Sequence, residues 1–522
     1  MSTERGSLVS ILDRAAQGGG GLEQWSQIPE RRGKYSYEEV KRASERLGLL
    51  LQERNVKPGD RVVIWGTESP QWAMSFFGAL RIGAIAVPFD RDGDMDFLGK
   101  VTEATNPQVI IAGPGQRKKL PQGFDIPILE MEKAHEIHGQ EGTGLPDVDI
   151  SAGDIAEIVY TSGSTGNPKG VVLTHGNITS NVEALGKIIS LSNARLLSIL
   201  PASHMFEQNN GLIAPMDQGV SVVYIDGLLR PDRLKQAMVD EQITGMVVVP
   251  DILRSFMESI KKEARDTGKQ TGLHIINNYG EHLPMGLRRR LAHEIIEKMG
   301  GKFEFFIVGG ATIDPKLPRF FESIGIKVLQ GYGMTEASPV ISCDRMNDRN
   351  HKPGYVGRVV PGVEVQITPD EEIIVRGPSV FPMYYNNPDK TAEVIDKDGW
   401  FHTGDAGFLD RRGGLVFHGR KKEDIIVLGN GMNVHTADVL QHLLGQNEDV
   451  RDAVILGIDG ELHAILLPGE EMDPKTVLQK ANKGFPPYMR IRYCTVWPDD
   501  DFPRTPNKKP AIKEIQKRLK DM

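Results

Sequence analysis

Cysteine is nearly absent from this sequence. Only Cys343 and Cys494 occur among the 522 residues, and they stand in dissimilar contexts. Two such residues provide neither a disulfide framework nor a cysteine-based metal site, and they fit a reducing compartment. The stretch from Met1 to Gly21 is polar and lacks the apolar core of a signal peptide. We therefore expect a cytoplasmic protein.

A broad excess of positive charge is lacking as well. Lysine and arginine number 62 against 70 aspartates and glutamates, which gives a net charge of −8. This balance argues against nucleic acid as a partner. No apolar run is long enough to span a bilayer, which leaves only a loose peripheral membrane contact open. A hydrophobic content of 39% and a length of 522 residues indicate a globular chain of at least two domains.

Strand and helix patterns alternate through most of the chain, which predicts mostly parallel sheets with helices on their faces. A capping box begins at Ser36 and precedes an amphipathic helix, and Ser69-Pro70 starts a second helix. We expect residues 1–34 to form a poorly ordered lead-in that ends in a turn. The strands that we predict are 61–65, 84–87, 109–112, 155–160, 171–175, 197–200, 220–225, 246–249, 303–308 and 327–329, with further helices at 234–239 and 287–299.

The pattern changes from about Gly354 onward. Glycine and proline become dense, and short strands replace the alternation. Gly413-Gly414 and Asp459-Gly460 are hairpin-turn signals between apolar stretches. We place a domain boundary near Gly419, followed by a C-terminal domain of about one hundred residues, an ordinary size for a small domain.

The strongest candidate site is the loop that follows strand 155–160. From Tyr160 to Gly170 it reads Tyr-Thr-Ser-Gly-Ser-Thr-Gly-Asn-Pro-Lys-Gly. Glycine lets backbone N–H groups turn toward an anion, the hydroxyls add donors, and Lys169 adds a positive charge. It is not a Walker A loop, because Asn-Pro separates Gly166 from the lysine. A flexible surface loop is the alternative, but a lysine held between proline and glycine after a buried strand favours polyphosphate binding.

A second strong signal is Gly331-Tyr332-Gly333-Met334-Thr335-Glu336, which follows a predicted strand. The tyrosine ring can stack on a purine, the threonine can donate to a phosphate, and the glutamate can hold Mg²⁺. The alternative is that Thr-Glu merely begins a helix, which does not account for Gly-Tyr-Gly.

Three weaker signals each have a purely structural alternative. His204 could orient a carboxylate, or it could be a core histidine. Gly309-Gly310 at a strand end could let a flat ligand approach, or could allow tight packing. Asp405 could accept hydrogen bonds from ribose hydroxyls, or it could be a turn residue. The basic run 420–422 would by itself be a solvated surface.

Together these motifs resemble the adenylate-forming superfamily, which includes acyl-CoA synthetases, firefly luciferase and the adenylation domains of peptide synthetases. The resemblance extends from the first amphipathic helix to Lys509, and His-Met-Phe-Glu at 204–207 is similar to the long-chain fatty-acid–CoA ligase branch. It implies an α/β fold with a large N-terminal domain, residues 1–419. That domain would hold mostly parallel sheets flanked by helices and a β-barrel-like part. A small mobile α+β lid, residues 420–522, would follow.

The resemblance also implies roles for individual residues. Lys509, Thr335, Glu336 and His204 would be catalytic, with Glu336 as the metal ligand and His204 beside the acyl pocket. Lys422 would be the hinge of the lid, and the loop around Gly431 would line the tunnel for pantetheine. The residues implied to contact ATP or CoA are Thr161, Ser162, Gly163, Ser164, Thr165, Gly166, Lys169, Gly310, Ala311, Gly331, Tyr332, Gly333, Asp405, Arg420, Lys422 and Gly431.

One departure from the family pattern concerns the catalytic lysine. The motif normally has glycine before the lysine, whereas this sequence has Lys508 in that position. Lys508 therefore competes with Lys509 for the role, and a charged surface tail is the alternative for both.

The function we favour is activation of a fatty acid, or another small carboxylic acid, with ATP and Mg²⁺, followed by transfer to coenzyme A with release of AMP and pyrophosphate. Two rival enzymes remain open: a fatty acyl-AMP ligase that serves a carrier protein, and an aryl- or short-chain-acid–CoA ligase. A rival of another class is a non-catalytic acyl- or nucleotide-binding protein with the same fold.

Overall fold

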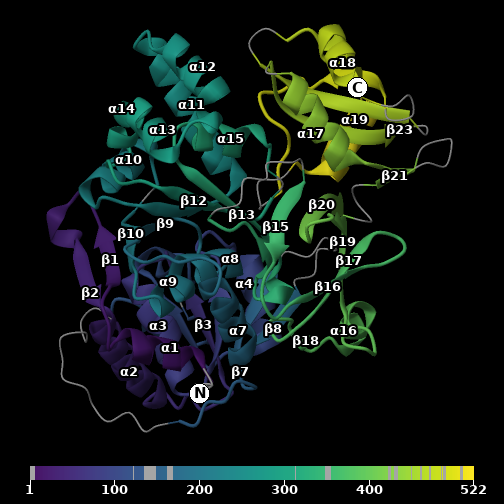
Figure 1. Cartoon of the computed structure of the whole chain (residues 1–522). Coiled ribbons are helices and arrows are strands. Elements are labelled where there is room, and N and C mark those ends of the chain that lie inside the picture. Colours follow the sequence, from purple (N-terminus) through teal and green to yellow (C-terminus); the bar gives the residue numbers. More distant parts are fainter. Residues whose placement is uncertain are drawn as a thin grey trace.

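The structure is a computed structural model, and two sheets organise it (Figure 1). It describes residues 6–121, 123–133, 148–161, 169–227, 229–311, 313–346, 354–420, 425–427, 433–447, 449–458, 461–469, 472–483, 485, 490–505 and 510–521.

The smaller sheet has seven strands and carries the ends of the glycine-rich loop. Five of its strands run parallel, and the two strands at one side join them by antiparallel pairing. In spatial order the strands are β18 (Met383–Tyr384), β8 (Lys169–Thr174), β7 (Ile155–Thr161), β4 (Ile85–Phe89), β3 (Arg61–Trp65), β5 (Val109–Ala112) and β6 (Ile128–Glu130).

The larger sheet has thirteen strands, parallel from β13 to β1 and antiparallel elsewhere. In order they are β16 (Glu364–Ile367), β17 (Glu372–Arg376), β19 (Phe401–Leu409), β20 (Gly414–Arg420), β15 (Tyr355–Val359), β14 (Val340–Cys343), β13 (Lys327–Gly333), β12 (Phe305–Val308), β11 (Gly245–Val248), β9 (Arg195–Ser198), β10 (Ser221–Ile225), β1 (Gly21–Trp25) and β2 (Gly33–Ser36).

The β-barrel-like part that we expected is instead an open extension of this sheet. The antiparallel strands β14, β15, β20, β19, β17 and β16 continue from β13 in that order, and β16 is the edge strand among the described residues. Within the described residues the strands do not return to close a barrel.

Helices form three layers around the two sheets. One hydrophobic core lies between the sheets and combines side chains from both with helices α1 (Leu8–Ala15), α2 (Tyr37–Gln52), α3 (Pro70–Arg81), α7 (His175–Gly186) and α9 (Ala214–Asp217). A second core covers the other face of the larger sheet with α10 (Pro231–Asp240), α11 (Pro250–Asp266), α12 (Gln270–Tyr279), α14 (His293–Lys298) and α15 (Lys316–Ser323). Helix α4 (Met95–Thr105) covers the outer face of the smaller sheet.

Short helices occupy several connections, and some serve the site described below. They are η1 (Pro29–Arg31), α5 (Pro114–Arg117), α8 (Met205–Glu207), the π-helix η2 (Gln208–Ile213), η3 (Gly280–His282), α13 (Met285–Leu291), η4 (Thr335–Ala337) and α16 (Pro388–Val394).

Helix boundaries follow local signals in the sequence. Ser36 and Glu39 form the expected capping box of α2, and Ser69 caps α3. The strand that we expected at 171–175 ends at Thr174, because this residue caps α7 in a box with Asn177. The single helix expected at 287–299 is two helices, which meet at Ala292.

The expectation of a poorly ordered lead-in is wrong for the described part of residues 1–34. Helix α1 buries Leu8, Ile11 and Leu12 at helical spacing against the central core, and β1 pairs in parallel with β10. The lead-in is ordered because it supplies the helix and edge strands that complete this core and sheet.

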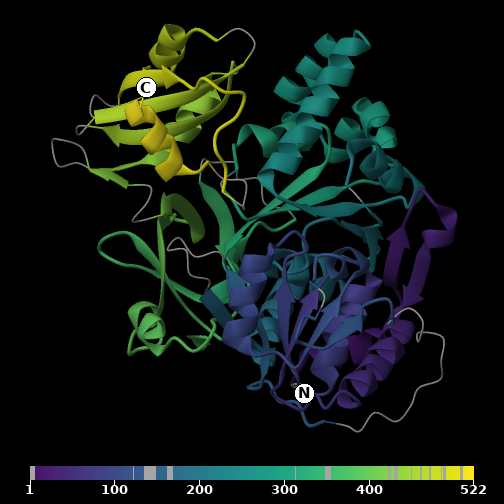
Figure 2. The same ribbon diagram turned by 180° about the vertical axis from the view of Figure 1, so that it is seen from behind.

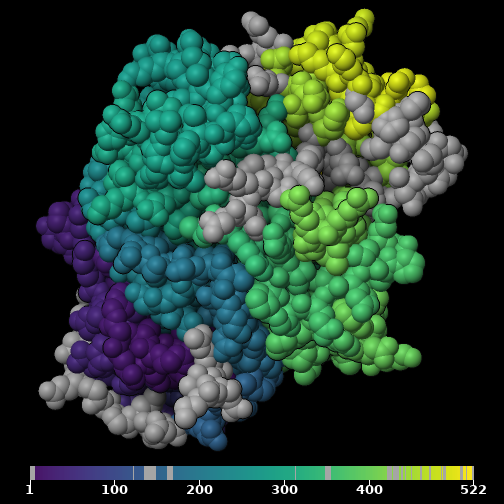
Figure 3. All heavy atoms as spheres, viewed as in Figure 1, coloured from purple at the N-terminus to yellow at the C-terminus, as the bar shows by residue number. Residues whose placement is uncertain are grey.

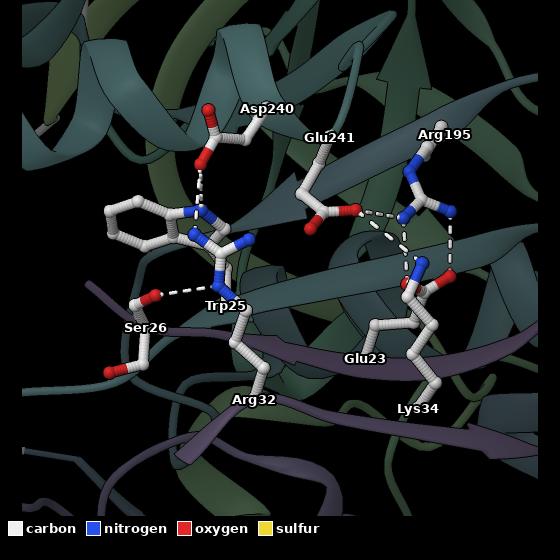
Figure 4. A network of polar contacts seen from close by, with 8 residues as sticks. All are labelled: Glu23, Trp25, Ser26, Arg32, Lys34, Arg195, Asp240 and Glu241. Atoms are coloured by element: carbon white, nitrogen blue, oxygen red, sulfur yellow. Dashed lines mark hydrogen bonds and ion pairs between the residues drawn. The ribbon is translucent and has the colours of Figure 1, made fainter. Parts of the chain in front are cut away.

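A polar network fixes the β1–β2 segment to the rest of the larger sheet (Figure 4). Arg195 donates to both carboxylate oxygens of Glu23, at 2.6 and 2.7 Å, and also pairs with Glu241. Nearby, the indole of Trp25 and the guanidinium of Arg32 both donate to Asp240 Oδ2 at 2.9 Å.

The C-terminal residues gather at one end of the molecule (Figures 2 and 3). They build two small sheets and have hydrophobic cores of their own. Within the described residues, both of these cores contain only residues from 426 onward. The division at 419/420 and the mobility of the lid stay predictions. The elements are β21 (Ile425–Val427), β22 (Asn433–His435), α17 (Thr436–Gln446), β23 (Val450–Ile458), β24 (Glu461–Pro468), α18 (Pro474–Asn482), β25 (Ile491–Val496) and α19 (Ile512–Asp521).

Candidate active site

Three motifs leave the larger sheet at the same edge. Strands β9, β11, β12 and β13 run parallel as neighbours, with Val308 of β12 beside Gln330 of β13. His204 follows β9, Gly310 follows β12, and Tyr332 lies near the end of β13. Ligands of open α/β sheets bind at the carboxyl ends of such strands. The topology therefore brings these three motifs to one side of the sheet.

The second strong motif and the Asp405 motif meet in a hydrogen bond. Tyr332 Oη donates to Asp405 Oδ2 at 2.7 Å, and the tyrosine ring lies 5.5 Å from that of Phe417. Asp405 is buried in β19, and its backbone lies opposite that of Arg420 in the pairing of β19 with β20. A flat ring and a carboxylate thus lie together, as binding of a nucleoside requires.

Gly333 is required by its backbone surroundings. A Cβ placed there would lie 1.8 Å from the carbonyl oxygen of Pro339. The chain reverses at this point, because β13 and β14 pair antiparallel across Tyr332 and Gly333. This close approach explains the second glycine of the Gly-Tyr-Gly motif.

Glu336 and Lys169 are linked through Tyr384, which the sequence analysis did not single out. Tyr384 Oη donates to Glu336 Oε1 at 2.9 Å, and Lys169 Nζ lies 5.7 Å from the centre of the tyrosine ring. Strand β18 carries Tyr384 and pairs antiparallel with β8, which begins at Lys169. Burial, and then the charge of Glu336, raises the pKa of Tyr384 far above its usual value, so its hydroxyl stays a donor.

The ends of the glycine-rich loop are held together by strand pairing. Thr161 of β7 lies opposite Lys169 of β8.

Thr335 is half-buried in η4, next to Glu336, whereas Gly310 and Ala311 are exposed after β12. Gly331 of β13 pairs with Cys343. The predicted residues that lie outside the described ones are Ser162, Gly163, Ser164, Thr165, Gly166, Lys422, Gly431 and Lys509.

His204 is not a core histidine. Its side chain is 55% exposed, and Nε2 lies 3.2 Å from Asp90 Oδ2, just after β4. Burial would raise the pKa of Asp90, but the hydrogen bond from His204 and nearby positive charge lower it below its usual value. The pair therefore joins the two sheets with a partly exposed imidazole.

Buried carboxyl groups lie close to this pair and were also missed. Glu207 is 1% exposed and accepts a hydrogen bond from Ser198 Oγ, while Glu68 pairs with Arg91. Burial raises the pKa of Glu207 to about 8 and that of Glu68 to about 7. The glutamate of His-Met-Phe-Glu was visible in the sequence, but its burial depends on tertiary packing.

The donor set fits a magnesium ion that is shared with a nucleotide. Glu336 is a half-buried carboxylate beside the Thr335 hydroxyl. Over the part of the chain that the structure describes, no group of three or more metal-ligating side chains occurs. Magnesium in nucleotide sites uses one or two carboxylates and completes its shell with phosphate and water. A carboxylate beside a hydroxyl fits a cation that shares its shell with phosphate and water.

A family model for AMP-binding enzymes matches residues 13–385. The chain is 28% identical over 448 residues to a long-chain-fatty-acid–CoA ligase of Mycobacterium bovis, covering 79% of this chain and 73% of that protein. It is 27% identical over 525 residues to 4-coumarate-CoA ligase 1 of Narcissus pseudonarcissus, covering 93% and 88%. ATP-bound MatB from Rhodopseudomonas palustris superposes with a TM-score of 0.79 at 22% identity, covering 98% of this chain and 99% of that one. This likeness confirms the α/β fold.

None of the described helices combines the length and the apolar character that a membrane-spanning segment needs.

Proposed function

This chain belongs to the AMP-binding enzyme family of adenylate-forming acyl-CoA ligases, and we propose that its acid substrate is a fatty acid. The observation that carries the assignment of the site is the contact between Tyr332 and Asp405. It brings together the ring that we expect to stack on the purine and the carboxylate that we expect to bind the ribose. Lys169, Tyr384 and Glu336 extend the same site toward the phosphates.

In the first step, a carboxylate oxygen of the acid attacks the α-phosphorus of ATP. The bond from that phosphorus to the bridging oxygen breaks, and pyrophosphate leaves. Lys169 and the hydroxyls of the glycine-rich loop hold the outer phosphates, and Thr335 donates to the α-phosphate. Glu336 would hold Mg²⁺, which supplies charge neutralisation when bound. Such chemistry depends mainly on positioning and on opposing the phosphate charge.

In the second step, the thiol of coenzyme A attacks the acyl carbon of the adenylate. The thiol proton goes to solvent, the acyl–oxygen bond breaks, and AMP leaves. We propose that residues 420–522 rotate about Lys422 between the steps, so that Lys509 serves the first and the loop around Gly431 serves the second.

Support for a fatty acid comes from the segment around His204 and from relatives named long-chain-fatty-acid–CoA ligases. A second candidate is an aryl acid, since the relative from Narcissus pseudonarcissus is named a 4-coumarate-CoA ligase and is matched over 93% of this chain.

A panel of carboxylic acids, scored for pyrophosphate release with and without coenzyme A, tests the proposal. We expect release to be strongest with medium- or long-chain fatty acids, together with consumption of free thiol. A preference for coumarate or benzoate would establish the aryl alternative. Release without thiol consumption would indicate transfer to a carrier protein, and silence across the panel would indicate a non-catalytic binding protein.

A further inference from the structure

Two buried asparagines connect the candidate motifs and have no role in the scheme above. We propose that Asn181 and Asn209 are positioning residues, which hold the turn bearing Thr335 and Glu336 in place relative to Lys169 and the His204 segment. The inference rests on the proposed function, because the turn matters only where it binds a nucleotide.

Asn181 reaches this turn from the helix that follows the glycine-rich loop. Helix α7 begins directly after β8, the strand that starts at Lys169. Asn181 is fully buried, and its Nδ2 donates to the carbonyl oxygens of Val340 at 2.8 Å and Ala337 at 3.4 Å. Its Oδ1 accepts from Asn209 Nδ2 at 3.0 Å. One side chain thus joins α7 to both ends of the turn.

Asn209 reaches the same turn from the His204 segment. It lies in the π-helix η2, five residues after His204. Its Nδ2 donates to the carbonyl oxygen of Ser338 at 2.8 Å as well as to Asn181 Oδ1. π-Helical turns are rare and occur often at functional sites. The Asn209 amide therefore connects the segment that begins at His204 with the backbone just after Glu336.

One atom of Asn209 has no protein partner in the part of the chain that the structure describes. Its Oδ1 is buried and has no hydrogen-bond partner among the described residues. Leaving a buried acceptor unpaired opposes folding. The side chain is therefore held by the two bonds that its Nδ2 donates.

The same turn is also held from a third segment, residues 379–381. Ser338 has a left-handed backbone with φ of 62°, and its hydroxyl donates to the carbonyl oxygen of Ser379 at 2.8 Å. Phe381 N–H donates to the carbonyl oxygen of Glu336 at 2.8 Å. If either asparagine amide is lost, the Thr335 hydroxyl and the Glu336 carboxylate shift relative to Lys169. Small displacements of this kind lower the rate of a reaction that depends on positioning.

The test compares Asn209→Ala with Asn210→Ala. The first variant removes only the two donated bonds, since Oδ1 has no partner to lose. The control removes the neighbouring buried amide of Asn210. Its Nδ2 donates to Phe206 O at 2.8 Å, so the lost bond lies within one segment. We expect kcat of ATP–pyrophosphate exchange to fall ~10- to 100-fold in Asn209→Ala relative to the control. KM for the acid should change by less than about 3-fold, since contacts to the acid are kept.

Asn181→Ser should reproduce this loss, and its combination with Asn209→Ala should lower kcat by less than the product of the two single effects. Thermal midpoints of Asn209→Ala and the control should be similar. Equal kcat in Asn209→Ala and Asn210→Ala would overturn the inference, as would a rise in acid KM without a fall in kcat. If Asn209→Ala does not fold, kcat of Asn209→Ser is compared with that of Asn210→Ala in its place.

Failure of the proposed function gives a different result. If no acid of the panel supports pyrophosphate exchange by the wild type, the fatty-acid assignment fails. Calorimetric titration with ATP and Mg²⁺ then decides the positioning role. A dissociation constant raised at least ~10-fold in Asn209→Ala over the control would support it, and equal constants would overturn it.

Discussion

The hydroxyl of Tyr384 donates to Glu336 Oε1 across 2.9 Å, and this contact joins residues 48 positions apart in the chain. Burial and the charge of Glu336 raise the pKa of Tyr384, so the hydroxyl does not ionise in the neutral range. The contact fixes one oxygen of the carboxylate that we propose as the magnesium ligand. It also links that carboxylate to the β18–β8 strand pair, and so to Lys169.

We expect Tyr384→Phe to lower kcat of adenylate formation by roughly 10-fold, because loss of a charge-assisted hydrogen bond leaves Glu336 free to rotate. The magnesium concentration for half-maximal pyrophosphate exchange should rise as well. Tyr385→Phe is the matched control, since the backbone N–H of Tyr385 donates to Gly170 O and is unaffected. An unchanged magnesium dependence in Tyr384→Phe would contradict the proposed role of the contact.

Local signals were sufficient to predict much of the parallel part of the fold. The capping box at Ser36 and the Ser69-Pro70 start place α2 and α3, and short apolar runs place β3 and β5. These elements depend on side chains that are close in sequence, so pattern reasoning reaches them.

Long-range pairing is the reason why other features were missed. Tyr384 lies in a two-residue strand whose pairing with β8 leaves no periodic pattern. Asn209 follows another polar residue and reads as loop, yet it is buried because its partners, Asn181 and Ser338, come from distant segments. Helix α1 buries Leu8, Ile11 and Leu12 at helical spacing, a pattern that the prediction for residues 1–34 missed.

His175 should make stability depend on pH in the acidic range. Its Nδ1 accepts the backbone N–H of Leu8 at 3.2 Å, which ties α1 to α7. Burial lowers the pKa of His175 to about 4, with the charge of Asp154 opposing this effect. Between pH about 4 and about 6.5 the unfolded chain binds a proton that the folded chain excludes. The free energy of unfolding therefore falls as pH drops through this window, and the full contribution is present above it.

Urea unfolding at about pH 5 and about pH 7.5 measures this dependence. His175→Asn, which offers an acceptor near the position of Nδ1, should reduce the difference between the two values. His274→Asn, at an exposed position of α12, should leave the difference as in the wild type. An equal pH dependence in His175→Asn and the wild type would exclude His175 as the source.

Glu157 should act in the opposite direction. It is fully buried in β7 and accepts from Gln208 Nε2 at 3.0 Å. Burial raises the pKa of Glu157 to about 8, and the bond from Gln208 lowers it only in part. Between pH about 4.5 and about 8 the folded chain keeps a proton that the unfolded chain has lost, so the free energy of unfolding falls as pH rises.

Glu157→Gln keeps an oxygen acceptor for Gln208 and cannot ionise. We expect it to gain stability relative to the wild type at about pH 8 by more than at about pH 5, as seen by urea unfolding. Glu258→Gln, at an exposed position of α11, serves as the control. A constant offset between Glu157→Gln and wild type at both pH values would show that Glu157 does not titrate in this range.

Arg195 and Lys34 both contact Glu23, but they should contribute unequally to stability (Figure 4). Arg195 makes two hydrogen bonds to Glu23 and its side chain is 23% exposed, whereas Lys34 lies 2.9 Å from Glu23 Oε2 and is 70% exposed. Removing Arg195 leaves a buried carboxylate without its main partner, and we expect Arg195→Ala to cost roughly 2–4 kcal/mol. Lys34→Ala should cost less than about 1 kcal/mol, because a solvated ion pair is weak. Thermal or urea unfolding of the two variants gives the comparison, and similar losses would show that exposure does not set these values.

A lysine that acts only in the first step should separate the two half-reactions. A cation that opposes the charge developing between the carboxylate and the α-phosphate is needed only while the adenylate forms. If Lys509 supplies it, Lys509→Ala should lower adenylate formation by at least ~100-fold and largely spare thioester formation from supplied acyl-AMP. Lys508→Ala is the matched control at the adjacent position. Loss confined to Lys508→Ala would move the role by one residue. Equal loss of both half-reactions in Lys509→Ala would mean that this lysine supports the lid in both steps instead of the first chemical step alone.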